Sequence, residues 1–497
     1  METGNPEGLT GLRAGDIARL VGGARVVPRG GGGRVTRIAA RPEDGGPDAL
    51  FVCIRGVSAD GHAFAGKAVA AGCRILVVER ELPEGADQVV VPDARRALAL
   101  VAAALAGDPS RRLRVFGVTG TNGKTTSAYL MRAVLEAAGL RSGLVGTVES
   151  IVGGHPVAAS HTTPGPDALQ HLFARMLAEG DEACAMEVSS HALSQQRVAG
   201  VHFAAAVFTN LTQDHLDYHA GFEEYFQAKR LLFAPSAGPA PPGAANADDA
   251  YGARLVDELG LLRFGVDAPA DVTARDVRMD ARGTEATVVT PAGEVALRTR
   301  LAGRYNLSNC LGVIAGAHLM GLPPEAAVRG IAGLPGVPGR MEPIDAGQPF
   351  SVLVDYAHTP DSLENVLRAA RGFAGRGRVI VVFGCGGDRD AGKRPQMGRI
   401  ARELADVAVV TSDNPRSEAP VSIIDQIVSG ATRGGDLRVE PDRRAAIALA
   451  VELARDDDVV VIAGKGHERG QEVAGVVTPF DDRDVAREVL AGRAEGW

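Results

Sequence analysis

The sequence predicts an α/β protein built of three domains, because apolar strand-like runs alternate with helix-like runs along its 497 residues. A chain of this length exceeds one hydrophobic core and corresponds to about three domains of roughly 150 residues each. Shifts in pattern place the domains at residues 1–110, 111–342 and 343–497. Hydrophobic residues make up 45% of the chain and 63 residues are glycine, which suits packed strands joined by tight turns rather than a disordered chain.

The first block, residues 1–110, contains three short strand-like runs and an alanine-rich helix. The runs read ALFVCI, CRILVVE and QVVVP, and the turn-like segment GDPS at residues 107–110 closes the block. This pattern predicts a small α/β domain.

The second block, residues 111–342, opens with LRVFGVTGTNGKTTSAYLMRAVLEAAG, which reads as a strand, a glycine loop and a helix that begins near Thr125. Backbone amides at such a junction bind phosphate, with help from the helix dipole. Lys124 would then reach the β- and γ-phosphate oxygens, and Thr125 would offer its hydroxyl to Mg²⁺. The loop departs from the strict GxxxxGKS/T pattern, because Val118 stands where the first glycine is expected. The segment predicts a site for a nucleoside triphosphate.

Two further strands of this block end in polar residues. The strand in ACAMEVSSHAL ends at Glu187, and Ser189, Ser190 and His191 follow it. The strand in AAAVFTNLTQDHLDYH is followed by Asp214, His215, Asp217 and His219. The HLDYH segment fits either a histidine pair on a metal-binding helix or a polar turn, and zinc is disfavoured because no third histidine or cysteine stands nearby. Beside a phosphate loop, carboxylate and hydroxyl oxygens suit Mg²⁺. The Pro/Ala/Gly-rich segment 235–244 predicts an exposed loop.

Lysine is rare in this chain, since only five of its 53 basic residues are lysines. A lysine retained under such a bias indicates a role that needs a compact ammonium or a reactive amine. Lys67 lies in an ordinary helix-like run and is expected on the surface. The other four lie in dense signatures: Lys124 in GTNGKTT, Lys229 in EEYFQAKR, Lys393 in GGDRDAGKRP and Lys465 in AGKGHE.

Lys229 is either a lysine on a helix surface or a buried amine with a chemical role. Arg230 shows that arginine is accepted beside it, which favours the second reading. A buried, neutral lysine can react with CO₂, and the carbamate is a carboxylate-like metal ligand.

The third block, residues 343–497, repeats one pattern four times: a buried strand followed by a polar signature. The four segments are VLVDYAHTP, RVIVVFGCGGDRD, VAVVTSDNPR and DVVVIAGKGHE. Helical runs separate the strands, so the block predicts a parallel sheet. Ligands bind at the carboxyl ends of the strands in such sheets, where all four signatures fall.

Nine motifs in order over residues 117–472 resemble those of the Mur ligase family, in its diaminopimelate-adding branch. They are GTNGKTT, MEVSSHAL, NLTQDHLDYH, LAGRYNLSN, GRME, VDYAHTPDSL, GCGGDRDAGKRP, SDNPR and AGKGHE. The resemblance implies a UDP-binding first domain, a P-loop ATPase second domain and a Rossmann-like third domain. It also implies that ATP drives the joining of meso-2,6-diaminopimelate to UDP-N-acetylmuramoyl-L-alanyl-D-glutamate, with Mg²⁺ as cofactor.

The resemblance also implies four groups of site residues. The nucleotide is held by Gly120, Thr121, Asn122, Gly123, Lys124, Thr125, Thr126, Asn306, Arg340 and Asp355, and His358 lies near them. The UDP substrate is held by Ala40, His161, Thr162, Thr163, Ser189, Gln195 and Arg197. Diaminopimelate is held by Arg389, Asp413, Asn414, Pro415, Arg416, Gly464 and Glu468. The metal site comprises Thr125, Glu187, His215 and Lys229, with Lys229 as N6-carboxylysine; Lys124, Glu187, His215 and Lys229 are the catalytic residues.

Two segments depart from the family pattern. Where the family often has Leu-Asp-Ser-Arg, this chain reads Ile38-Ala39-Ala40-Arg41, so a hydroxyl is missing on the uridine side. His161 stands where a small polar residue or asparagine is expected. Asp60-Gly61-His62 still resembles the next loop of that pocket.

Composition and charge narrow the class of protein. A net charge of −8 without a basic block argues against nucleic-acid binding. The longest apolar run, LALVAAALAG, is about half of a membrane span, and the first residues lack the pattern of a signal peptide. Five scattered cysteines suit free thiols in a reducing cytoplasm.

Two other functions are weighed against this one. A sister ligase, such as a folylpolyglutamate synthase or another Mur enzyme, would share the ATP loop and the lysine but is expected to lack the DNPR and GKGHE pair. A related ligase that adds a different amino acid, L-lysine, is also an alternative. A regulatory or motor P-loop NTPase would bind nucleotide without ligating anything. The sequence shows neither an NKxD motif nor an ABC signature, which disfavours that class.

Overall fold

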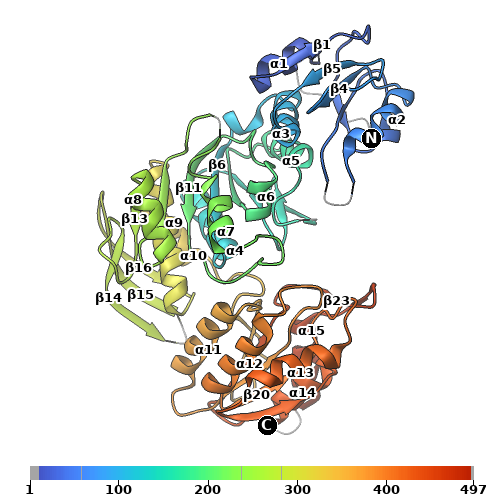
Figure 1. The fold of residues 1–497 in the computed structure, drawn as a ribbon. Helices are drawn as coiled ribbons and strands as arrows, with labels where there is room; N and C mark the ends of the chain where they lie inside the picture. Colours follow the sequence, from blue (N-terminus) through green and yellow to red (C-terminus); the bar gives the residue numbers. More distant parts are fainter. Residues whose placement is uncertain (1–10, 57–58, 160, 237, 281–282, 494–497) are drawn as a thin grey trace. The chain divides into compact units, whose positions relative to one another are not determined.

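The computed structural model describes residues 11–56, 59–159, 161–236, 238–280 and 283–493 (Figure 1). The chain forms two compact units. The first comprises residues 1–117, 140–204 and 231–241, and the second comprises residues 118–139, 205–230 and 242–497. The division into three domains at residues 1–110, 111–342 and 343–497 stays a prediction.

The first unit contains a five-stranded sheet in the order β1-β5-β4-β3-β2, in which β1 alone is antiparallel to its neighbour. Helices α1 and α3 pack on one face of this sheet and α2 packs on the other. The bounds are α1 Ala14–Val21, β1 Arg25–Val27, β2 Arg37–Ala39, β3 Ala49–Val52, α2 Ala65–Ala70, β4 Ile75–Val78, β5 Asp87–Val90 and α3 Ala94–Leu105. The three predicted strands and the alanine-rich helix are confirmed.

The rest of the first unit carries β7, β8, β9 and β10 beside the start of β6. Strands β7 and β10 are parallel, whereas β8 and β9 continue the sheet as antiparallel strands. The bounds are β6 Arg114–Thr119, β7 Ser142–Val145, β8 Ser150–Val152, β9 His155–Val157, α5 Pro166–Ala178, β10 Ala183–Glu187 and α6 Ser190–Ser194. Glu187 ends β10, as the sequence predicts.

The second unit begins with the end of β6 and continues through the parallel strands β11, β12 and β13. The bounds are α4 Lys124–Ala137, β11 Phe203–Phe208, α7 Phe222–Arg230, β12 Gly243–Asn246, α8 Ala250–Leu259, β13 Leu262–Phe264, α9 Arg304–Leu319 and α10 Pro324–Gly333. The predicted end of the loop at residues 235–244 is wrong by two residues, because Gly243 and Ala244 belong to the buried strand β12. The HLDYH segment is a turn rather than a helix.

A three-stranded antiparallel sheet in this unit was not predicted from the sequence. It comprises β14 Thr273–Asp280, β15 Gly283–Thr290 and β16 Gly293–Thr299. Helix α10 packs against β16 and α4.

The carboxyl-terminal part of the second unit is a six-stranded sheet in the order β17-β18-β22-β19-β20-β21, parallel except for β17. Helices α11, α12 and α13 cover one face, and α14 and α15 cover the other. The bounds are β17 Glu342–Pro343, β18 Ser351–Asp355, α11 Pro360–Ala374, β19 Val379–Phe383, α12 Lys393–Leu404, β20 Val407–Val410, α13 Pro420–Gly430, β21 Asp436–Val439, α14 Arg443–Leu453, β22 Val459–Ala463, β23 Gly470–Val473, β24 Val476–Pro479 and α15 Asp482–Arg493. The four predicted strands are neighbours, so their polar signatures lie along one edge of the sheet.

Candidate active site

The glycine loop lies between β6 and α4, as the sequence predicts. Gly123 has a φ of +86°, and a Cβ there would lie 2.3 Å from Asn309 Oδ1, so only glycine fits. Lys124 Nζ donates to the carbonyls of Gly120 and Thr121 at 2.9 and 2.8 Å, which folds the lysine over the loop. Thr125 is buried in the first turn of α4. The loop therefore offers an ammonium, a hydroxyl and a helix amino terminus to an anion.

Lys229 is buried under this loop. Its side chain is 1% exposed, and Nζ donates to the Gly120 carbonyl at 2.7 Å. The ammonium also lies 4.4 Å from the centre of the Tyr225 ring, one helical turn earlier in α7. Burial and the nearby Lys124 charge lower the pKa of Lys229 well below its ordinary value, although Asp214 opposes them. The surface-lysine interpretation is therefore wrong.

Arg340 and Asn306 lie beside the same loop in the second unit, and Asp355 lies near Arg340. Arg340 donates to the Thr125 hydroxyl at 2.9 Å and stacks 4.6 Å over the Tyr356 ring. Burial raises the pKa of Asp355, and the Arg340 charge opposes that rise. Asn306 reaches the loop through Asn309, whose amide nitrogen lies 3.4 Å from Asn306 Oδ1.

The first unit gathers six of the predicted residues at the end of β10. Thr163 donates its hydroxyl to the Glu187 carbonyl at 2.9 Å and accepts from the Ser189 N–H at 3.1 Å. Arg197 donates to the Thr163 carbonyl at 2.8 Å, and its guanidinium also donates to Gln195 Oε1 at 3.2 and 2.9 Å. The arrangement sets hydroxyl, amide and guanidinium groups side by side, which suits a polar, anionic ligand.

Glu187 and Thr162 are joined by Thr147, a residue that the sequence analysis missed. The Thr147 N–H donates to Glu187 Oε1 at 2.7 Å, and its hydroxyl lies 3.1 Å from Oε2 and 3.0 Å from the Thr162 hydroxyl. Glu187 is 1% exposed, so these contacts keep a buried carboxylate satisfied. A spacing of 40 residues from Glu187 gave no local signal for Thr147.

Two other residues expected to hold the UDP substrate, Ala40 and His161, are exposed. Ala40 comes directly after β2, and His161 comes directly before Thr162. His62 is different, because its ring is buried and its Nδ1 lies 2.6 Å from Asp60 Oδ1.

The donor set for a metal is tested by its chemistry. Among the described residues, no three His, Cys, Asp or Glu side chains form a group that could hold a metal ion by themselves. Mg²⁺ on a nucleotide takes one or two protein oxygens and fills its other positions with phosphates and water, so a complete protein cage is not required. The Thr125 hydroxyl in the second unit and the Glu187 carboxylate in the first unit are oxygens of this kind. By the chemistry of its donor atom, each residue taken alone fits the ion.

His215 stands in the turn after β11 with a φ of +55°. Its Nε2 lies 3.4 Å from Asp214 Oδ2. Burial would raise the pKa of Asp214, but the charges of His215, His358, Lys393 and Lys124 outweigh it and lower that pKa. Asp214 is therefore an anion facing several cationic groups beside the phosphate loop.

A second cluster lies at the carboxyl ends of β20 and β22. Asp413 and Asn414 are each 8% exposed, and Lys465 is fully buried. Asn414 donates to Glu468 at 2.8 Å. Gly464 has a φ of +116°, and a Cβ there would lie 2.6 Å from Asp413 Oδ2. The ends of β20 and β22 therefore pack so closely that only glycine fits at position 464. Together they present the carboxylates of Asp413 and Glu468 and the amide of Asn414.

The predicted arginines differ in their surroundings. Arg416 has a φ of +51°, donates to the Gly387 carbonyl at 2.8 Å and lies 3.4 Å from Glu472. A Cβ on Gly387 would lie 1.9 Å from the Pro415 carbonyl, so the two loops touch through glycine. Arg389 is exposed on the same loop as Gly387.

The phosphate loop and the carboxyl-terminal sheet are connected within the second unit. Asn122 donates to Asp361, in the first turn of α11, at 2.7 Å. Gln213 donates to Asp390 at 3.0 Å and accepts from Gln396 at 3.1 Å. These contacts, together with Tyr225 and Thr147, are the functional candidates that the sequence reasoning missed. Only Tyr225 had a local signal, because it stands four residues before Lys229 on one helix face.

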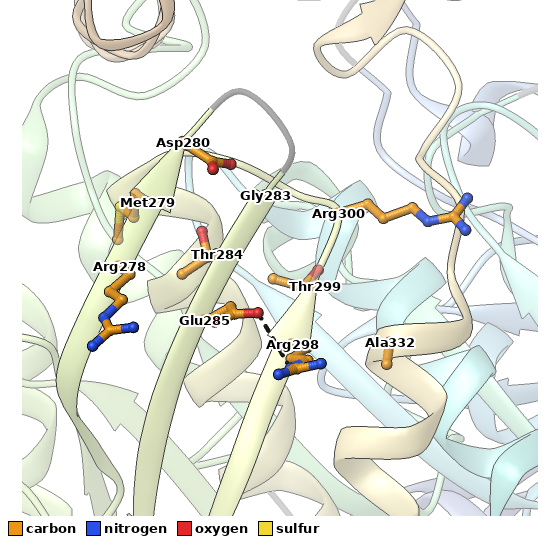
Figure 2. A pocket seen from close by; sticks show the side chains of 10 residues that line it. All are labelled: Arg278, Met279, Asp280, Gly283, Thr284, Glu285, Arg298, Thr299, Arg300 and Ala332. Carbon is orange, nitrogen blue, oxygen red and sulfur yellow. Dashed lines mark ion pairs between the residues drawn. The ribbon is translucent and has the colours of Figure 1, made fainter.

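A pocket of about 500 Å³ lies elsewhere in the second unit, on the three-stranded sheet and α10 (Figure 2). Its lining is Arg278, Met279, Asp280, Gly283, Thr284, Glu285, Arg298, Thr299, Arg300 and Ala332. Arg298 pairs with Glu285 across the strands, and Figure 2 shows Arg300 pointing away from that pair. None of the predicted site residues lines this pocket.

Comparison with known proteins gives one consistent family. Three sequence models match: "Mur ligase middle domain" at residues 118–317, "Mur ligase, glutamate ligase domain" at 339–466 and "Mur ligase family, catalytic domain" at 45–107. No helix among the described residues has the length and apolar character needed to cross a membrane.

Individual relatives and a solved structure agree with these matches. The UDP-N-acetylmuramoyl-L-alanyl-D-glutamate--2,6-diaminopimelate ligase of Geobacillus thermodenitrificans is 44% identical over 475 residues, covering 94% of this chain and 97% of the relative. The ligase of the same name from Gloeobacter violaceus is 47% identical over 457 residues, covering 90% and 92%. A solved structure of a ligase of this name is 31% identical with a TM-score of 0.67, covering 93% of this chain and 96% of the other.

Proposed function

The chain belongs to the Mur ligase family, and we propose that it is the ATP-dependent ligase that adds meso-2,6-diaminopimelate to the D-glutamate of UDP-N-acetylmuramoyl-L-alanyl-D-glutamate in peptidoglycan precursor synthesis. One observation carries the amino-acid part of this proposal. Asn414 and Glu468 are hydrogen-bonded at adjoining strand ends, with Asp413 and Arg416 beside Asn414 in the sequence, in the same compact unit as the phosphate loop. They supply acceptors for an ammonium and a guanidinium for a carboxylate.

The chemistry requires activation of the substrate carboxylate, because an amine does not displace an oxide-like leaving group at neutral pH. A carboxylate oxygen attacks the γ-phosphorus of ATP, the bond to the β-phosphate oxygen breaks, and ADP leaves an acyl phosphate behind. The free amine of diaminopimelate attacks the acyl carbon to give a tetrahedral intermediate. Collapse of this intermediate expels phosphate, and the nitrogen loses a proton as the amide forms.

Lys124 and the amino terminus of α4 bind the phosphates in this scheme. The Lys124 ammonium donates to two carbonyls of the loop. When a nucleotide binds to the loop, the same ammonium would donate to its phosphate oxygens. Asn306, Arg340 and Asp355 surround the nucleotide. Bound Mg²⁺, held through Thr125, Glu187 and His215, would offset charge as two anions approach one another.

Lys229 is proposed to be carbamylated. It is buried, its lowered pKa favours the neutral amine that reacts with CO₂, and it contacts the phosphate loop. The product, N6-carboxylysine, would supply an anionic oxygen ligand for Mg²⁺ in place of the neutral amine. An arginine at this position could not undergo the reaction.

The cluster of the first unit is proposed to hold the UDP substrate. Thr163, Ser189, Gln195 and Arg197 are joined by hydrogen bonds, and Thr162 is bound to Thr147, which also contacts Glu187; these side chains can donate to carboxylate or phosphate oxygens. Ala40, on the uridine side, and His161, before the threonine pair, are also proposed to hold the UDP substrate, and at both positions the chain departs from the family pattern. We also propose the domains 1–110, 111–342 and 343–497, for the UDP substrate, ATP and the amino acid.

The amino-acid site is proposed to comprise Arg389, Asp413, Asn414, Pro415, Arg416, Gly464 and Glu468. Arg416 binds the distal carboxylate in a two-pronged contact, which a lysine cannot reproduce. Because all five cysteines are free thiols, we expect the reaction to take place in the reducing cytoplasm.

The test is phosphate release by the purified full chain with ATP and the UDP-dipeptide while the amino acid is varied. Release that depends on meso-diaminopimelate and yields the UDP-tripeptide supports the proposal. A clear preference for L-lysine would assign the chain to a different ligase of the family, and nucleotide hydrolysis without any amide product would exclude a ligase.

A further inference from the structure

Lys465 has no role in the scheme above, although its side chain is fully buried at the end of β22. Its Nζ lies 3.0 Å from Asn414 Oδ1 and 3.0 Å from Glu468 Oε2. Asn414 Nδ2 donates to the same Glu468 oxygen at 2.8 Å. Lysine, asparagine and glutamate therefore form a closed triangle of hydrogen bonds.

This triangle determines how the polar atoms face a ligand. Asn414 Oδ1 accepts from Lys465 and from the Glu472 N–H, the latter at 3.0 Å, so the amide cannot rotate without losing both bonds. Both partners of Glu468 bind Oε2, which leaves Oε1 for an incoming donor. The Glu468 side chain is 31% exposed, so a ligand can reach it from solvent.

The same ammonium balances charge inside the cluster. Burial would raise the pKa of Asp413, but Arg443 and Lys465 outweigh it and hold that pKa below its ordinary value. Without such cations, the neighbouring carboxylates of Asp413 and Glu468 would favour the uptake of a proton. A protonated carboxyl group is a poorer acceptor for an ammonium than a carboxylate.

We propose that Lys465 is a positioning residue for the amino-acid substrate, holding Asn414 and Glu468 in the one arrangement that accepts the substrate ammonium. This inference rests on the proposed function, because it assumes that Glu468 binds diaminopimelate. Lys465 acts through its two neighbours and does not itself contact the substrate.

The proposal also explains why this position is a lysine in a chain that otherwise uses arginine. A compact ammonium has three donors, and Lys465 Nζ uses them on Asn414 and Glu468. The backbone on either side is close-packed, because Gly464 meets Asp413 as described and a Cβ on Gly466 would lie 2.7 Å from Tyr356 Cβ. A planar guanidinium is larger and has a different donor geometry.

The experiment compares three variants of Lys465 with wild type in the full chain. Lys465→Met removes charge and donors, Lys465→Gln restores donors only, and Lys465→Arg restores charge with a larger group. The control is Lys67→Met, on the exposed face of α2. The measurements are kcat and KM for each of the three substrates, and trapping of the acyl phosphate by hydroxylamine with diaminopimelate withheld.

Lys465→Met is expected to raise KM for meso-diaminopimelate about 10- to 100-fold, as for the loss of a charge-assisted hydrogen bond, with a smaller fall in kcat. KM for ATP and for the UDP-dipeptide, and acyl-phosphate trapping, are expected to stay near wild type. Lys465→Gln should recover part of the loss and Lys465→Arg little of it. Lys67→Met should match wild type throughout.

Three results would overturn the inference, each in a different way. An unchanged KM for diaminopimelate in Lys465→Met, with an active wild type, rejects the positioning role alone. A uniform loss of all partial reactions in both Lys465→Met and Lys465→Gln assigns the residue to general folding instead. Wild type that fails to use diaminopimelate rejects the proposed function and this inference with it.

Discussion

The buried ion pair between Arg443 and Asp482 gives the sharpest prediction on stability. Both side chains are 0% exposed, and Arg443 donates to the two carboxylate oxygens at 2.7 Å each. The guanidinium also donates to the Ala463 carbonyl at 2.9 Å. The pair therefore joins the starts of α14 and α15 to the end of β22, directly beside the amino-acid site.

Arg443→Met leaves the Asp482 carboxylate buried without a counterion. Removing one partner of a buried pair costs about 3–5 kcal/mol of folding free energy. The next residue offers a matched control, because Arg444 pairs with Glu488 while 54% and 61% of the two side chains are exposed. Exposed pairs contribute about 0–1 kcal/mol, so Arg444→Met should be nearly neutral.

Thermal unfolding of the full chain, monitored by circular dichroism, measures the difference in stability between the two variants. At roughly 2–4 °C per kcal/mol for a domain of this size, Arg443→Met should lower the Tm of its transition by about 6–20 °C. The double variant Arg443→Met/Asp482→Leu should recover most of this loss, since an apolar pair avoids the unpaired charge. The reasoning fails if Arg443→Met lowers the Tm no more than Arg444→Met does.

The remaining predictions concern catalysis. Lys124→Ala should reduce hydroxylamine trapping of the acyl phosphate to background, because the phosphates lose their ammonium; undiminished trapping would remove Lys124 from the phosphate site. Lys229→Arg should lose nearly all ligase activity in the phosphate-release assay despite its preserved charge, and turnover like wild type would reject the carbamate. Arg416→Ala should lower kcat/KM for meso-diaminopimelate about a hundredfold while hardly changing the poor use of L-lysine. Unchanged kinetics with diaminopimelate would show that Arg416 does not bind its carboxylate.

Local patterns were sufficient to predict the parts of the fold that position the site. The strand before the glycine loop and the four strands of the third block were predicted because continuous apolar runs ended in glycine or polar residues. The rarity of lysine also proved informative, since Lys229, Lys393 and Lys465 are all buried and Lys67 is exposed. The rarity of lysine drew attention to these residues, and their position inside or outside a dense signature distinguished the buried lysines from the exposed Lys67.

Contacts between distant residues could not be predicted in this way. Asn122 and Asp361 are 239 residues apart, and Thr147 and Glu187 are 40 apart. Nothing local marks such partners, because they depend on how strands are ordered in the sheets. The β14–β16 sheet had a usable signal in the segment 283–299, where alternating residues flank a tight turn, but the pattern was not recognised. The roles of the individual site residues stay predictions.

The central claim is that the wild-type chain forms an amide with meso-diaminopimelate at the expense of ATP. Its most direct test is mass spectrometry of the products formed from ATP, the UDP-dipeptide and an equal mixture of meso-diaminopimelate and L-lysine. We expect the diaminopimelate-containing UDP-tripeptide, with one ADP and one phosphate formed for each amide. A product that contains mainly L-lysine, or ADP without any tripeptide, would contradict it.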